Sequence, residues 1–195
     1  VGFLAPAVVG VATVGLPWWG GLPALLAAGA VEGAVLGGAQ ATVLRRELPA
    51  LRRDRWVALT AAAAVAAYVL GAGTTYAGTA APWWLQGVLF PVLGVALLCT
   101  IGAAQWVELR HHVPRAGRWI GWTAVAWLCA LGAFLAIASP LWHEGQGLAY
   151  GIAVGVVAGV VMAAVQAVVT GWGLVRLLRD ADRSRPDGSL ARSAA

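Results

Sequence analysis

Six long apolar stretches, separated by short connections, constrain the fold of this chain more than any other feature. They cover about 1–17, 22–44, 56–77, 84–108, 119–138 and 147–175. A helix needs roughly 20 apolar residues to cross a bilayer, and most of these stretches have about that length. Charged residues make up only 11% of the chain, compared with about 25% in soluble domains. The pattern therefore predicts an all-α, polytopic membrane protein with six transmembrane helices.

The basic residues lie on one side of the predicted topology. All 13 are arginines, and they fall at 45–55, at 110–118 and from 176 onward. Because cytoplasmic loops carry the excess of basic residues, we expect a membrane protein with both termini in the cytoplasm. The net charge of +5 then reflects membrane anchoring. The lipid bilayer is the expected partner, together with other membrane protein subunits, and nucleic acid is not.

The chain also contains an internal repeat. A Pro-Trp-Trp motif at 17–19 and Gln40 recur 65 residues later, at 82–84 and at Gln105. An Arg-Trp-x-x-x-Thr motif opens the next unit at 55–60 and again at 118–123, and a less regular third copy ends at Gln166. We therefore expect a transmembrane domain, 1–178, made of two-helix repeats at about 1–54, 55–117 and 118–178. A polar cytoplasmic tail follows at 179–195.

Because each repeat contains two helices, successive repeats enter the membrane from the same side. Such parallel repeats are related by an axis along the membrane normal. The simplest arrangement is a pseudo-threefold bundle, and a sequential row of helices is the alternative. Small residues spaced by four allow helix backbones to approach closely. The glycines predicted to mediate this packing are Gly29, Gly33, Gly37, Gly94, Gly102, Gly151, Gly155 and Gly159.

Tryptophans gather near the predicted helix ends, where their rings typically anchor a protein at the membrane interface. The predicted anchors at the ends without arginines are Trp18, Trp19, Trp83, Trp84 and Trp142. Trp56 and Trp119 are the predicted anchors at the arginine-bearing ends.

Four polar residues within the spans are candidates for a polar or ion site. Gln40, Gln105 and Gln166 occupy the same repeat position, where a glutamine either hydrogen-bonds a neighbouring helix or joins a polar ring around the axis. We favour packing. Glu32 lies deep in its span, and a carboxylate there indicates either proton or cation handling or a protonated side chain bonded to a neighbour. By contrast, Glu108, Glu47 and Asp54 are expected to form surface ion pairs of little energetic weight.

The sequence contains no pattern typical of a catalytic, metal or cofactor site, so we expect no enzyme activity, no metal and no cofactor. The stretch Gly102–Arg110 has the pattern Gly-x-x-Gln-Trp-x-x-Leu-Arg and is followed by Arg118-Trp119. It resembles a recurring pattern in bacterial multi-pass membrane proteins of unknown function. The resemblance implies tandem helical hairpins in a bacterial inner (plasma) membrane, and it carries no activity with it.

Two functions are consistent with these features. The first is a non-enzymatic membrane subunit that scaffolds or stabilises a membrane protein complex, or binds lipid. The alternative is a small transporter or channel that uses Glu32 and the ring of Gln40, Gln105 and Gln166. Binding of a lipid or quinone between the helices is a third, weaker hypothesis.

Overall fold

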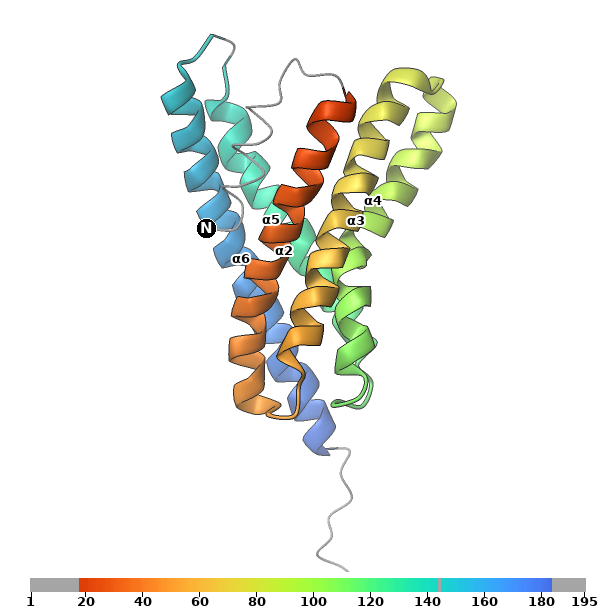
Figure 1. The fold of residues 1–195 in the computed structure, drawn as a ribbon, viewed down its shortest axis with the longest axis vertical. Helices are drawn as coiled ribbons and strands as arrows, with labels where there is room; N and C mark the ends of the chain where they lie inside the picture. Colours follow the sequence, from red (N-terminus) through yellow and green to blue (C-terminus); the bar gives the residue numbers. More distant parts are fainter. Residues whose placement is uncertain (1–17, 144, 184–195) are drawn as a thin grey trace, which may run out of the picture.

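The structure, a computed structural model, describes residues 18–143 and 145–183. Its helices are α2 (Trp18–Glu47), α3 (Arg53–Ala80), α4 (Trp83–Leu109), α5 (Arg118–Leu141) and α6 (Leu148–Arg183) (Figure 1). All five described helices are long and apolar enough to cross a membrane, which confirms the all-helical membrane prediction. The predicted first span, 1–17, lies outside the described residues, as does the tail beyond 183.

Prolines lie next to two of the helix ends, and a residue with positive φ lies in one of the connections. α2 ends two residues before Pro49, since the residue preceding a proline is disfavoured in helical conformation. α4 starts directly after Pro82, which has an extended backbone and caps the helix. Arg115 adopts a left-handed conformation, with φ of 56°, in the short basic connection before α5. Five helix ends, the last residues of α2, α4 and α6 and the first residues of α3 and α5, lie at the end of the bundle that carries the arginines, here called the arginine end.

Consecutive helices pack on one another: α2 on α3, α3 on α4, α4 on α5 and α5 on α6. No other pair of described helices brings Cα atoms within 8 Å. The described part of the chain thus follows the sequential alternative, and it does not confirm the pseudo-threefold arrangement. In Figure 1 the helices lie close together at the lower, arginine end and diverge toward the upper end.

The core lies at the arginine end. It consists of Ala41, Leu44, Leu51, Trp56, Leu109, Val113, Ala116, Trp119, Leu174 and Leu177, so that all five described helices and two connections contribute. Trp56 is 0% exposed and Trp119 is 3% exposed, and their ring centroids are 6.3 Å apart. The prediction that these two rings are interfacial anchors is wrong, because both point into the core instead of toward lipid head groups.

The opposite half of the bundle is more open among the described residues. Trp83 and Trp84 are exposed, and so are Val88, Phe90 and Val92 on the same helix. Trp142 is also exposed. Exposed aromatic rings at a helix end are typical of membrane-interface residues, so these three tryptophans fit the predicted anchor positions. Trp18 and Trp19 open α2.

Glycines set the crossing of α2 on α3. A Cβ at Gly33 would lie 2.7 Å from Ala61 Cα, and one at Gly37 would lie 2.9 Å from Thr60 Cβ. Gly102 repeats the second contact one unit later, at 3.0 Å from Thr123 Cβ. These contacts agree with the predicted close packing.

The remaining predicted glycines behave differently. A Cβ at Gly94 or Gly155 would meet nothing described within 4 Å, and at Gly151 it would meet only the Gln146 side chain at 3.4 Å. At these three positions no described backbone lies close to the glycine, so the packing contact stays a prediction there. Gly159 is buried.

Candidate functional site

Glu32 is buried and has a partner. Its side chain is 6% exposed, and the Tyr68 hydroxyl donates a hydrogen bond to its Oε2 at 2.8 Å. Gly29, one turn earlier, makes this approach possible, because a Cβ there would lie 2.5 Å from the Tyr68 ring. The α2–α3 crossing thus brings a phenol to this carboxyl group, in agreement with the alternative that Glu32 is bonded to a neighbouring side chain.

Gln105 is the centre of a second polar group. Its Nε2 donates to Gln40 Oε1 at 2.7 Å and to Thr60 Oγ1 at 3.1 Å. Its Oε1 accepts a hydrogen bond from Trp119 Nε1 at 2.9 Å. Gln105 is fully buried, and its amide joins α2, α3 and α5 to α4. We call Gln40, Thr60, Gln105 and Trp119 the glutamine cluster.

Gln166 does not join the glutamine cluster. It is 3% exposed, and its Nε2 has no hydrogen-bond partner in the part of the chain that the structure describes. Thr123 Oγ1, which occupies the repeat position of Thr60, also lacks a partner. Of the three glutamines predicted to form a ring, only Gln40 and Gln105 are therefore hydrogen-bonded to each other.

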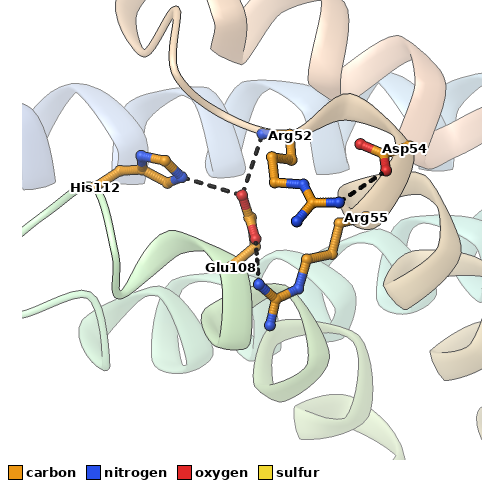
Figure 2. A network of polar contacts seen from close by, with 5 residues as sticks. All are labelled: Arg52, Asp54, Arg55, Glu108 and His112. Carbon is orange, nitrogen blue, oxygen red and sulfur yellow. Dashed lines mark hydrogen bonds and ion pairs between the residues drawn. The ribbon is translucent and has the colours of Figure 1, made fainter.

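Glu108 anchors a third polar group, at the arginine end (Figure 2). Its Oε1 accepts a hydrogen bond from the Arg52 backbone N–H at 3.1 Å and lies 3.1 Å from His112 Nε2. Its Oε2 lies 3.3 Å from Arg55 Nη1, and the carboxylate is 2% exposed. The expectation of a surface ion pair is wrong for Glu108. The expectation holds for Asp54, which pairs with Arg52. The Arg52 side chain is 64% exposed and that of Asp54 is 75% exposed.

The repeat explains part of this arrangement. Arg55 and Arg118 open corresponding units, and each pairs with a carboxylate on the helix that returns. Arg55 pairs with Glu108 of α4, and Arg118 pairs with Asp180 of α6 at 2.8 Å. The two carboxylates are not at equivalent repeat positions, so the repeat alone could not reveal them. The recurring Arg-Trp motif was the sequence signal that could have pointed to these two ion pairs.

These polar groups are arranged to hydrogen-bond neighbouring helices, which favours a role in helix packing over transport through a polar ring. The Gln40 and Gln105 amides are bonded to each other, and a pair of amides that satisfy one another has less capacity left to bind a passing ion. Among the described residues, no cluster of three or more His, Cys, Asp or Glu side chains is arranged to hold a metal ion. Two surface depressions lie elsewhere, one at the α2–α3 connection and one between α5 and α6.

The fold, with five described helices long and apolar enough to cross a membrane, is that of a helical membrane protein. The chain matches no family model, no curated protein and no solved structure.

Proposed function

We propose that the protein is a non-enzymatic integral membrane subunit that scaffolds or stabilises a membrane protein complex or binds lipid. The observation that carries the proposal is the glutamine cluster, in which one buried amide links four helices. A hydrogen bond between membrane helices typically contributes about 0.6–2 kcal/mol, so this group stabilises the arginine end as a rigid unit. The described half of the bundle at the opposite end exposes apolar side chains around much of α4, which supports contact with lipid or with another subunit.

Native mass spectrometry of the protein, released gently from its own membranes, tests this proposal. A second protein at fixed stoichiometry is the expected result. A bare monomer that retains neither protein nor lipid would contradict it.

The topology is part of the proposal. The arrangement has six spans in three hairpins, in a bacterial inner membrane, with the arginine end in the cytoplasm. The distribution of the 13 arginines supports this orientation. Reporters that are active on only one side of the membrane, fused within the 110–117 connection and within the 142–147 connection, should report opposite sides. The same side for both would contradict the topology.

A second candidate, a small proton or cation transporter, rests on the pair of Glu32 and Tyr68. Glu32 lies 13 residues before Arg45, which is about 20 Å of helix rise. This places the carboxylate deep in the span, where an ionisable residue indicates function by default.

Liposomes containing the purified protein would separate this candidate from the scaffold. If the protein transports, Glu32→Gln should abolish proton or cation flux, whereas Tyr68→Phe should change its rate and preserve the fold. An absence of flux with the parent protein would remove the candidate.

A further inference from the structure

A groove of about 490 Å³ lies between α5 and α6 at the arginine end. Arg118, Arg176 and Asp180 line its charged part, and Gly121, Trp122 and Val125 line the part that continues along α5. Counted from Arg118, these α5 residues lie three, four and seven positions further on, so all four share one face of the helix. The groove thus has a charged head and an apolar strip in line with it.

Arg176 is held in place by two tryptophans. Its guanidinium carbon lies 3.8 Å from the centre of the Trp172 ring and 5.8 Å from that of Trp122. The two rings meet edge to face, with centroids 5.2 Å apart. Gly173 permits this packing, because a Cβ there would lie 2.6 Å from Trp122 Cγ.

This mode of binding leaves the Arg176 donors available. A cation–π contact uses the face of the guanidinium, and the N–H groups point outward in its plane, where they match the oxygens of a phosphate. Among the described residues, Arg176 makes no ion pair with a carboxylate. Its side chain is therefore positioned in advance, and no carboxylate among the described residues neutralises its charge.

The rest of the groove adds positive charge and an apolar surface. Arg118 donates to Asp180 at 2.8 Å, and Arg183 approaches the same carboxylate at 3.9 Å. The described lining of the groove holds two arginines and one aspartate, so it is cationic. Beyond it, a Cβ at Gly121 would meet nothing described within 4 Å, and Val125 is 48% exposed. Basic pockets between membrane helices are typical sites for anionic lipid head groups.

We propose that this groove binds one anionic phospholipid. The phosphate lies between Arg176 and Arg118, and an acyl chain follows the strip over Gly121 and Val125. This site deepens the lipid-binding part of the proposed function and rests on it. It does not require a protein partner.

The full-length protein, delipidated in detergent, should be titrated with dioleoyl phosphatidylglycerol and followed by native mass spectrometry. We expect one tightly retained lipid, and Arg176→Gln should weaken its binding about tenfold or more, since it removes a charge-assisted contact. Arg46→Gln, which removes the same charge from the exposed end of α2, is the matched control and should bind as the parent does. Equal losses in the two variants, or no loss in Arg176→Gln, would overturn the site.

Two further arms identify the source of the phosphate. Inorganic phosphate and glycerophosphoglycerol should compete poorly, because they lack the acyl chain, and dioleoyl phosphatidylcholine should bind more weakly. Head-group compounds that compete as well as the lipid would overturn the proposal in favour of a soluble phosphate ligand.

Gly121→Leu supplies an independent variant that leaves every arginine in place. It fills the apolar strip at an open position and should also weaken lipid binding; unchanged binding would overturn the acyl-chain position. Retention of a protein partner by the parent protein is scored separately in the same spectra. A parent that keeps a partner but binds phosphatidylglycerol no more tightly than phosphatidylcholine would remove this site and leave the scaffold standing. Selective lipid binding without a protein partner would remove the scaffold alone.

Discussion

The α3–α4 and α5–α6 hairpins begin with the same Arg-Trp-x-x-x-Thr motif but are held together by different interactions. In α3–α4, polar bonds dominate: Arg55 pairs with the buried Glu108, and Thr60 accepts a hydrogen bond from Gln105. In α5–α6 the corresponding arginine pair, Arg118 with Asp180, is more exposed. Thr123 Oγ1 and Gln166 Nε2 have no hydrogen-bond partner among the described residues. Aromatic packing between Trp122 and Trp172 takes their place. The comparison indicates that the repeat fixes where the helices run, whereas each hairpin acquires its own means of attachment.

The largest effect is expected at the carboxylates that close the two hairpins. Glu108→Ala removes a buried group with three partners, and since contacts to charged groups contribute about 1.5–3 kcal/mol, we expect a loss of about 3 kcal/mol. Asp180→Ala breaks a pair whose side chains are 55% and 38% exposed, and it should cost about 1 kcal/mol or less. Thermal unfolding in detergent, followed by tryptophan fluorescence, measures both. Equal shifts in the two midpoints would contradict the difference between the hairpins.

The second effect tests aromatic packing in α5–α6. Gly173→Val places side-chain atoms where the Trp122 ring lies, and overpacking of this kind costs about 1–3 kcal/mol. Gly171→Val, two residues earlier, enters open space and serves as the control, with a change below about 0.5 kcal/mol. If both variants unfold at the parent temperature, Trp122 does not pack as described.

The outcome at particular residues shows what sequence could and could not predict. The spacing of 65 residues placed Gln40 and Gln105 at one level of the membrane, and they are hydrogen-bonded at 2.7 Å. Trp56 was misassigned because a tryptophan at a helix end looks the same in sequence whether it points to lipid or to the core. Its direction depends on the rotation of α3 about its axis, which the close contact of Gly37 with Thr60 sets.

Glu108 shows a related limit. The corresponding positions in the other repeats are Val43 and Val169, so the carboxylate is not part of the repeated scaffold, and charged residues near helix ends are most often solvated. The Arg52 backbone N–H, 56 residues away in the sequence, donates a hydrogen bond to this carboxylate. Such a partner lowers the cost of burying the charge. Periodicity and spacing contain no information about that contact.

The third effect separates the two buried glutamines. Gln105→Leu removes three hydrogen bonds and leaves the Gln40, Thr60 and Trp119 groups without this partner, so we expect a loss of about 1–2 kcal/mol. Gln166→Leu removes an amide nitrogen that is buried without a partner, and it should be neutral or slightly stabilising, because an unsatisfied buried donor costs free energy. Unfolding midpoints of both variants, measured in one detergent, give the answer. A larger loss for Gln166→Leu would reverse the comparison.

The smallest expected difference lies in the threonines of the repeated motif. Thr60 Oγ1 donates to the Trp56 carbonyl oxygen at 2.8 Å and accepts from Gln105. Thr60→Val therefore breaks two bonds, and about 0.5–1 kcal/mol should be lost. Thr123 Oγ1 is fully buried without a partner, so Thr123→Val removes an unsatisfied hydroxyl and keeps the shape that packs on Gly102. A rise in the unfolding midpoint for Thr123→Val, with a fall for Thr60→Val, is the expected pair of results. A fall of equal size in both would mean that the two hairpins use the repeated threonine in the same way, and the distinction between polar and aromatic attachment would then fail at the position where the repeat is most regular.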